Sequence, residues 1–210
     1  MKIITIAHQK GGVGKSTIAL NIATELSKQE KVKVIDLDYQ KSLTIYNQTR
    51  KEQKLLALNI IHVANKKELM NAIDRSEESI IIDSGGFDSE LNRVALMGSD
   101  LIITPVSNNM IEIYGLETFK NILEEIKDIK ENLKAHVLLN NINPRATKAI
   151  DELKEYIKTN NNYFNLFETV IRRRADFASS FEKGKSVMEI NPKSKAAHEL
   201  KNLLLEINNA

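Results

Sequence analysis

Short runs of β-branched and other apolar residues alternate along the chain with longer amphipathic stretches. The apolar runs predict buried strands at Ile3–Ala7, Val32–Asp36, Ser79–Asp83, Leu101–Thr104 and Ala135–Asn140. The amphipathic stretches predict helices at Ser16–Lys28, Lys66–Arg75, Ile113–Lys130 and Thr147–Lys158. Because strands and helices alternate, we expect a single three-layer α/β/α domain over residues 1–210, with a mainly parallel, twisted sheet. Ligands of such sheets bind at the carboxyl ends of the strands.

The last segment of the chain has one apolar face at helical spacing, formed by Ala197, Leu200, Leu203, Leu204 and Ile207. Such a face is typical of a helix packed on the core. The alternative is a membrane-targeting tail, which usually mixes basic residues with bulky aromatic ones. This segment contains Glu199 and Glu206 and no aromatic residue, so we expect no membrane contact.

Composition narrows the classes of protein that remain. The chain has 42% hydrophobic and 28% charged residues, as soluble globular proteins do. The absence of cysteine excludes disulfides, thiolate zinc sites and iron–sulfur clusters, and it fits a reducing cytoplasm. No apolar run approaches the roughly 20 residues that span a bilayer, and the first residues lack the features of a signal peptide. The net charge is only +2, but residues 134–195 hold 12 Lys/Arg against 7 Asp/Glu.

A glycine-rich segment with two lysines, Lys10–Thr17, follows the first predicted strand and opens the first predicted helix. Strand, loop and helix in this order are the context of a phosphate-binding loop. The backbone N–H groups of such a loop approach phosphate oxygens beside the positive end of the helix dipole. In this chain they belong to Gly11, Gly12, Val13 and Gly14.

The side chains that follow complete a predicted site for ATP and Mg²⁺. We expect Lys15 to reach the β- and γ-phosphates, Ser16 to place its hydroxyl on Mg²⁺, and Thr17 to contact the α-phosphate. A glycine-rich turn without a ligand is the alternative. Gln9 stands where the usual motif has its first glycine, and Lys10 follows it. This second lysine cannot easily crowd Lys15 on one phosphate, but it could extend across an interface to a nucleotide bound by another subunit.

Carboxylates close two of the predicted strands. Asp36 and Asp38 end the segment V-I-D-L-D, and Asp83 ends the apolar run I-I-I-D before Ser84-Gly85-Gly86. A carboxylate at such a place can order an attacking water or the shell of a magnesium ion. The glycines after Asp83 could let their loop approach the γ-phosphate as a switch. For Asp36 and Asp38, the alternative is two surface aspartates that close a β–α turn.

The segment K-G-G-V-G-K-S-T resembles the deviant Walker A motif of the ParA/MinD ATPases, and V-I-D-L-D-Y-Q is similar to their switch I pattern, D-x-D-P-Q. The resemblance implies the P-loop NTPase fold and an ATP-sandwich homodimer. It implies that Lys10 contacts nucleotide in trans, that Lys15 acts in cis, and that Asp38 positions the hydrolytic water.

The same resemblance implies that Asp36 supports the Mg²⁺ site and that Asp83 holds a magnesium-bound water. Asn140 would contact adenine, and a capping or turn asparagine is the alternative. The sequence departs from the family at Tyr39, where proline is common, and at Ser84-Gly85-Gly86, where D-x-P-P is common.

Basic residues gather in the C-terminal third. Three arginines precede a predicted short helix, Asp176–Lys183, where they would oppose its dipole, and this favours another use such as phosphate contact. The stretch T-V-I-R-R-R…E-K-G-K…P-K-S-K is similar to the C-terminal block of small partition ParA proteins. The resemblance implies nonspecific DNA binding by Arg145, Arg172, Arg173, Arg174, Lys183, Lys185, Lys193 and Lys195. A solvated basic face is the alternative.

The resemblance as a whole implies a cytoplasmic, nucleoid-associated partition ATPase. ATP closes a homodimer on nonspecific double-stranded DNA, and a ParB-like centromere-binding partner stimulates weak intrinsic hydrolysis. Because the chain starts at the first strand, we expect no N-terminal helix-turn-helix domain and no operator reading by this chain alone. One alternative is a MinD-like membrane-cycling ATPase. Another is a metabolic relative; the lack of cysteine excludes iron–sulfur carriers and nitrogenase-type reductases, and Lys10 opposes a biotin-pathway ligase.

Overall fold

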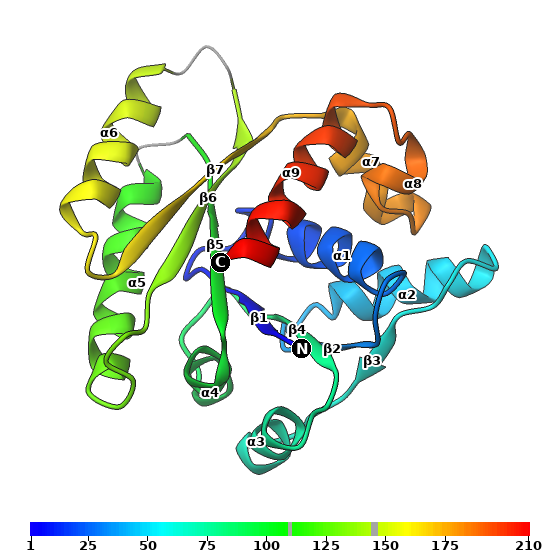
Figure 1. Ribbon diagram of the computed structural model, residues 1–210, viewed down its shortest axis with the longest axis horizontal. Coiled ribbons are helices and arrows are strands. Elements are labelled where there is room, and N and C mark those ends of the chain that lie inside the picture. Colours follow the sequence, from blue (N-terminus) through cyan, green and yellow to red (C-terminus); the bar gives the residue numbers. More distant parts are fainter. Residues whose placement is uncertain (109–110, 144–146) are drawn as a thin grey trace.

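A seven-stranded parallel sheet forms the centre of the computed structural model, which describes residues 1–108, 111–143 and 147–210 (Figure 1). The strands lie in the order β3-β2-β4-β1-β5-β6-β7, and every pair of neighbours is parallel. Their bounds are β1 Ile3–Ile6, β2 Val32–Asp36, β3 Asn59–Ile61, β4 Ser79–Asp83, β5 Leu101–Val106, β6 Ala135–Ile142 and β7 Phe164–Arg172. The predicted α/β fold with a parallel sheet is confirmed.

Helices cover both faces of this sheet (Figure 1). One face carries α1 Lys15–Leu26, α2 Ser42–Glu52, α7 Ala175–Lys183, α8 Val187–Ile190 and α9 Lys195–Asn209. The other face carries α3 Lys66–Asp74, α4 Glu90–Gly98, α5 Ile111–Lys127 and α6 Thr147–Thr159. Within the described ranges, no helix has both the length and the apolar character needed to cross a bilayer.

The central strands are apolar on both sides because both sides are buried. On β4, Ile81 packs into the cluster beneath α1 and α9, whereas Ile80 and Ile82 pack into the cluster beneath α3 and α4. A further cluster beneath α5 and α6 contains Phe119 and Phe164. Burial on both faces explains why the strands read as unbroken apolar runs in the sequence.

The register of the sheet brings the predicted site residues to one edge. Asp36 of β2 lies opposite Asp83 of β4, and Asp83 lies opposite Ile6, the last residue of β1. Strands that precede β5 in the chain lie on one side of β1, and β5 to β7 lie on the other. The loop that leaves β1 is therefore next to both carboxylates, at the kind of switch point where open α/β sheets bind ligands.

All strands and helices predicted from periodicity occur, with ends that differ by at most three residues. The sequence did not reveal α2, β3, α4, β7 and α8. Strand β3 has only three residues at a sheet edge. Strand β7 lies at the other edge, its burial alternates irregularly, and its register against β6 shifts twice. The segment that ends in three arginines therefore belongs largely to a strand, which local patterning did not show.

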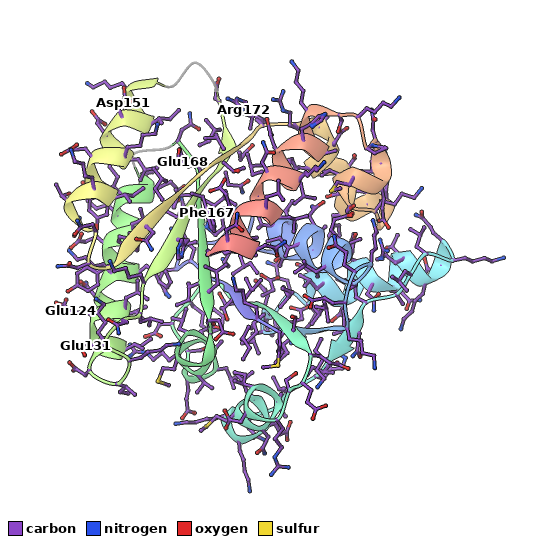
Figure 2. The ribbon with its side chains drawn as sticks, viewed as in Figure 1. Glu124, Glu131, Asp151, Phe167, Glu168 and Arg172 are labelled. Carbon is purple, nitrogen blue, oxygen red and sulfur yellow. The ribbon has the colours of Figure 1, made fainter. Side chains whose placement is uncertain are left out.

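Helix α9 packs along the outer edge of β7 (Figure 2). The carboxylate of Glu206 accepts hydrogen bonds of 2.8 Å from the backbone N–H groups of Glu168 and Thr169. Glu199 likewise accepts a bond of 3.1 Å from the N–H group of Arg172. These carboxylates satisfy donors that an edge strand would otherwise expose. The apolar face predicted for the last helix is buried against the core at all five predicted positions.

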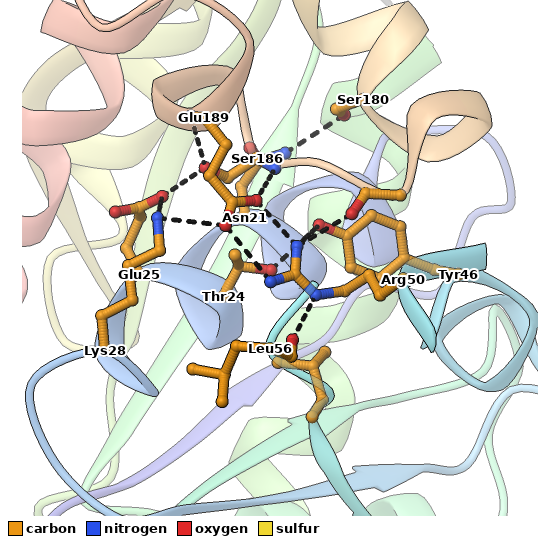
Figure 3. Close-up of polar contacts among 12 residues, drawn as sticks. Asn21, Thr24, Glu25, Lys28, Tyr46, Arg50, Leu56, Ser180, Ser186 and Glu189 are labelled. Carbon is orange, nitrogen blue, oxygen red and sulfur yellow. Dashed lines mark hydrogen bonds and ion pairs between the residues drawn. The ribbon is translucent and has the colours of Figure 1, made fainter. Parts of the chain in front are cut away.

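A buried polar network joins α1 and α2 to the segment that contains α7 and α8 (Figure 3). Arg50 of α2 is fully buried, and its Nη1 atom lies 2.7 Å from Oε2 of Glu189 in α8. Asn21 of α1 accepts a hydrogen bond of 2.8 Å from the backbone N–H group of Val187. The network fixes the C-terminal basic segment against the helix that begins in the glycine-rich loop.

Candidate functional site

The loop between β1 and α1 has the backbone geometry of an anion-binding site. Gly12 and Gly14 have φ angles of 79° and 94°, which residues with a Cβ atom rarely adopt. Gly14 is also the N-cap of α1, so no side chain at this position satisfies the first N–H groups of the helix. These N–H groups and the helix dipole favour a bound phosphate.

Lys15, the first residue of α1, is buried and turned back toward the loop. Its Nζ atom donates a hydrogen bond of 3.0 Å to the carbonyl oxygen of Lys10. Burial lowers the pKa of Lys15, while the carboxylates of Asp83 and Asp38 raise it. A lysine held by one backbone carbonyl can exchange that oxygen for a phosphate oxygen.

Asp83 and Asp36 are buried carboxylates with unused oxygen atoms. Both Oδ atoms of Asp83 and Oδ1 of Asp36 lack a hydrogen-bond partner among the residues that the structure describes. The other oxygen of Asp36 accepts bonds of 3.1 and 3.2 Å from the N–H and hydroxyl groups of Thr44. Burial raises the pKa of Asp83, the Ser16 hydroxyl lowers it and the Asp36 carboxylate raises it, and together with the charges nearby these effects bring it to about 8. Buried carboxylates of this kind are typical of cation sites.

These oxygens and the Ser16 hydroxyl fit Mg²⁺ together with a nucleotide. In the described part of the chain, no group of three or more His, Asp or Glu side chains could hold a metal alone. Mg²⁺ usually takes only one or two protein carboxylates, with waters and phosphate oxygens as its other ligands. The residues predicted for magnesium, Ser16, Asp36 and Asp83, are therefore suited to a metal that arrives with phosphate.

A cavity of about 480 Å³ opens beside the loop, and we call it the phosphate-side cavity. Its walls include Lys15, Ser16 and Asp38. Asp38 lies beyond the end of β2, as predicted, and its Oδ1 atom accepts a hydrogen bond of 2.8 Å from the N–H group of Gln40. Gly86 touches the loop, since a Cβ atom there would lie 3.2 Å from the backbone nitrogen of Gly11. The segment after Asp83 therefore lies against the phosphate loop.

A second cavity, of about 570 Å³, shares Gly12, Gly14 and Thr17 with the first and extends toward the ends of β6 and β7. We call it the base-side cavity. Asn140 lines it, and its side-chain Nδ2 donates a hydrogen bond of 2.7 Å to the carbonyl oxygen of Val13. Asn140 thus supports the phosphate loop.

The three consecutive arginines line this same base-side cavity. Arg172 is the last residue of β7, and Arg174 is the N-cap of α7. Glu199 of α9 lies 3.3 Å from Nη1 of Arg172 and 2.7 Å from Nη2 of Arg174. Only the side chain of Arg173 has no ion pair within the described residues. Arg172 and Arg173 lie before the helix, so the dipole argument for a phosphate partner applies only to Arg174, at the N-cap of α7.

The four lysines predicted to contact DNA lie at helix ends. Lys183 ends α7, and Lys185 follows it after Gly184. Lys193 precedes α9, and Lys195 begins it. Lys183, Lys193 and Lys195 are exposed, and no ion pair involves any of the four lysines in the described ranges. Arg145 lies outside the described residues.

Lys10 points away from the cavities toward α5. Its Nζ atom lies 2.8 Å from Oε1 of Glu112, and its backbone N–H group donates a bond of 2.9 Å to Nδ1 of His8. Burial, together with the charges of Lys15 and Lys10, lowers the pKa of His8 to about 3. The sequence analysis missed both partners. His8 could have been found from its place between strand and loop, but Glu112 is 102 positions from Lys10 and nothing local marks it.

The fold and this site define a phosphate-loop nucleotide-binding protein of the three-layer α/β class. The chain belongs to the CobQ/CobB/MinD/ParA nucleotide-binding domain family, whose model matches residues 4–187. Within that family it is similar to the ParA/MinD ATPases, as its relatives and structural neighbours indicate.

Two curated relatives match over almost their whole length. The chain is 24% identical to the sporulation initiation inhibitor protein Soj of Bacillus subtilis, with 98% of both chains covered. It is 22% identical to the maintenance of carboxysome distribution protein A of Halothiobacillus neapolitanus, with 97% of this chain and 95% of the relative covered.

Two solved structures share the fold. A candidate plasmid partition protein from Borrelia burgdorferi, bound to AMPPNP, has a TM-score of 0.74 at 23% identity, with 98% of this chain and 97% of that chain covered. A chain of the MinC:MinD cell division protein complex of Aquifex aeolicus has a TM-score of 0.74 at 16% identity, with 100% of this chain and 97% of that chain covered.

Proposed function

We propose that this protein is a ParA-like partition ATPase that forms an ATP-dependent sandwich dimer, binds nonspecific double-stranded DNA, and leaves it after partner-stimulated hydrolysis. One observation carries the proposal: a single phosphate loop holds two lysines, Lys10 and Lys15, beside buried carboxylates at the ends of β2 and β4. Lys15 suffices to bind phosphate in cis. Lys10 points away from both cavities of its own subunit. We assign it to the nucleotide of a second subunit, across a dimer interface.

Within one subunit, the loop N–H groups and Lys15 bind the phosphates, and Ser16, Asp36 and Asp83 hold Mg²⁺. The metal neutralises charge that develops on the transferred phosphoryl group. Asp38 orients the attacking water from the wall of the phosphate-side cavity. Intrinsic hydrolysis is slow, because no arginine lines this cavity in the described chain and an arginine finger is worth about 10³–10⁵ in rate.

The base and ribose of the nucleotide occupy the base-side cavity. Asn140 links this cavity to the loop, and Phe177 and Arg173 supply apolar and charged walls. The side chains of Arg172 and Arg174 form ion pairs with Glu199. Their positive charge is therefore partly neutralised, and they attract DNA phosphates less than the sequence suggests. Arg173, whose side chain has no ion pair within the described residues, is therefore the arginine of this segment that we assign to a nucleotide contact.

The DNA surface of the dimer is formed mainly by Lys183, Lys185, Lys193 and Lys195. Two features support this assignment: three of these lysines are exposed, and none has an ion pair within the described residues. The similarity to Soj and to a plasmid partition protein supports a nucleoid-associated role with a ParB-like partner.

Binding to nonspecific duplex DNA, measured by fluorescence anisotropy at fixed salt, tests the proposal. We expect binding with ATP or a slowly hydrolysed analogue, and none with ADP or without nucleotide. Lys10→Ala and Lys15→Ala should abolish it. Each of Lys193→Gln and Lys195→Gln should weaken it and reduce the slope of log K against log salt by about one unit. Lys67→Gln is the matched control, because Lys67 is an exposed lysine of α3 on the opposite face of the sheet.

If the protein binds ATP but no DNA in any nucleotide state, the partition proposal is wrong. Sedimentation with anionic vesicles and ATP then tests the MinD-like alternative. The packing of α9 opposes that alternative, because the apolar face of this helix is buried in the core and a membrane would have to displace it.

A further inference from the structure

The phosphate loop is held by its own chain through Lys10. The backbone N–H group of Lys10 donates to His8, and its carbonyl oxygen accepts from Nζ of Lys15 at 3.0 Å. Its Nζ atom donates to Oε1 of Glu112 at 2.8 Å. Both lysines of the loop are therefore occupied by groups of the protein itself.

Glu112 is a buried carboxylate that depends on Lys10 for its charge balance. Its side chain is 3% exposed, whereas that of Lys10 is 37% exposed. Oε1 also accepts a hydrogen bond of 3.0 Å from the hydroxyl of Ser107, and Oε2 has no hydrogen-bond partner among the described residues. Lys10 is the only cation that pairs with this carboxylate in the described ranges. Removing Lys10 would leave a buried charge without a counter-ion, which is costly.

We propose that Glu112 is a cis counter-ion that holds Lys10 on its own subunit, and that dimerisation requires Lys10 to exchange Glu112 for the nucleotide of a second copy of this chain. This inference rests on the proposed function, in which Lys10 acts in trans. The pair competes with the interface for the same ammonium group. It therefore lowers the affinity of the dimer without touching the nucleotide of its own subunit.

Nucleotide weakens this hold through Lys15. A bound phosphate competes with the carbonyl oxygen of Lys10 for Nζ of Lys15, because it offers this ammonium group a charged acceptor in place of a neutral one. Lys10 then loses one of its three attachments. ATP bound to one subunit thus loosens Lys10 of that subunit, which can then contact the nucleotide of the second subunit. This links ATP binding to dimer formation.

The test is the dimerisation of wild type and Glu112→Gln by sedimentation velocity with magnesium and a slowly hydrolysed ATP analogue. Gln keeps the shape and removes the charge, and Lys10 can turn to solvent, so the dimer should form at about tenfold lower protein concentration. Ser107→Ala should shift dimerisation in the opposite direction by less, because without this hydroxyl the buried Glu112 carboxylate depends more on Lys10. Glu131→Gln, an equal charge change at an exposed site beyond the other end of α5 (Figure 2), should behave as wild type.

The binding of labelled ATP to each monomer separates this inference from the proposed function. Equal ATP affinity with an easier dimer in Glu112→Gln supports the cis counter-ion. If wild type dimerises with the analogue but Glu112→Gln dimerises equally or less readily, Glu112 does not restrain Lys10 and the inference is wrong. If wild type stays monomeric at every nucleotide concentration, or Lys10→Ala dimerises as wild type does, the dimer step of the proposed function is itself wrong.

Discussion

The side-chain amide of Asn140 donates a hydrogen bond of 2.7 Å to the carbonyl oxygen of Val13, a residue 127 positions earlier in the chain. The same amide lies against the loop so closely that a Cβ atom on Gly14 would come within 2.3 Å of it. The sequence of β6 therefore controls the shape of a loop that belongs to β1 and α1. This contact gives Asn140 a function in the site whether or not it also touches a base.

Asn140→Ala should weaken ATP binding. The change leaves the buried carbonyl of Val13 without its donor, at a cost of about 1–3 kcal/mol. If the intact loop is required for phosphate binding, the dissociation constant for ATP should rise by about tenfold. Titration with a fluorescent ATP analogue measures this. Asn162→Ala, at an exposed asparagine in the turn before β7, should leave affinity unchanged; equal affinities for all three proteins would show that the contact is dispensable.

Asp83→Asn should stabilise the fold in the absence of magnesium. The pKa of Asp83 in the fold is about 8 against 3.8 in an ordinary carboxyl group, so the unfolded chain loses this proton at lower pH than the folded chain does. The stability that this proton supplies is complete below the pKa of Asp83 in the unfolded chain. It is lost as pH rises through the pKa of Asp83 in the folded protein. Asn carries no charge, so the variant should gain a few kcal/mol over wild type by about pH 8.

Thermal unfolding in EDTA at several pH values measures this difference. The gain of Asp83→Asn over wild type should grow as pH rises, whereas Asp128→Asn, an exposed control, should show no such trend. The same Asp83 variant should lose magnesium-dependent ATP hydrolysis, which would fit a site that sacrifices stability for function. A gain that does not change with pH would contradict the assignment of the proton to Asp83.

His8→Asn should make the protein more resistant to acid. Burial holds the pKa of His8 at about 3 against 6.5 in an ordinary imidazole, so the fold keeps it neutral while the unfolded chain takes up a proton. This stability is complete above the unfolded pKa and is lost as pH falls toward the folded one, by about 2 kcal/mol at pH ~5. The Oδ1 atom of the new Asn can accept the hydrogen bond from the backbone N–H group of Lys10 that Nδ1 of His8 accepts in wild type.

Urea unfolding at about pH 7 and pH 5 compares the proteins. Wild type should lose more stability than His8→Asn between the two values. His62→Asn, a change at an exposed histidine, should follow wild type. If wild type and His8→Asn lose stability equally, His8 is not the buried neutral group that the acid sensitivity requires.

The sequence predicted the parts of the site that lie within one strand–loop–helix unit or at the end of one strand. The glycine positions, Lys15 and the carboxylate of Asp83 follow from local pattern, because a parallel sheet places its strand ends at one edge. The contacts of Lys10 with Glu112 and of Asn140 with Val13 do not follow from it. They join segments more than a hundred positions apart, and only packing decides them.

The arginine segment, residues 172–174, also shows that local sequence does not reveal contacts between distant segments. Three adjacent positive charges suggested a DNA surface, but the fold puts Arg172 at the end of an edge strand and Arg174 at a helix start, both within reach of Glu199. From the sequence, Glu199 indicated only that the last helix does not bind a membrane, because it is acidic. A charge count cannot show which carboxylate neutralises which arginine, since that depends on how α9 lies along β7.

Arg50→Ala should destabilise the protein by about 3–5 kcal/mol. The guanidinium is fully buried and meets both oxygens of Glu189, at 2.7 and 3.2 Å. It also donates to the carbonyl oxygens of Gly184 and Leu56 at 2.8 and 2.7 Å. The change would leave the two carbonyls without this donor, and Glu189 would keep only Lys28, at 3.3 Å, and the N–H group of Ser186, at 2.9 Å. Arg50→Lys should recover little, because one ammonium group cannot reproduce the paired geometry.

Arg93→Ala is the matched control for this prediction. Arg93 also meets two carboxylates, Asp88 and Glu125, at 2.6 Å each, but its side chain is 33% exposed. Surface pairs are worth about 0–1 kcal/mol, so urea unfolding should separate the two variants clearly. Arg50 also ties α2 to Gly184, between two lysines of the proposed DNA surface, so folded Arg50→Lys should bind DNA less tightly than wild type in ATP. Equal small losses of stability for Arg50→Ala and Arg93→Ala would mean that the buried network does not hold the basic segment in place.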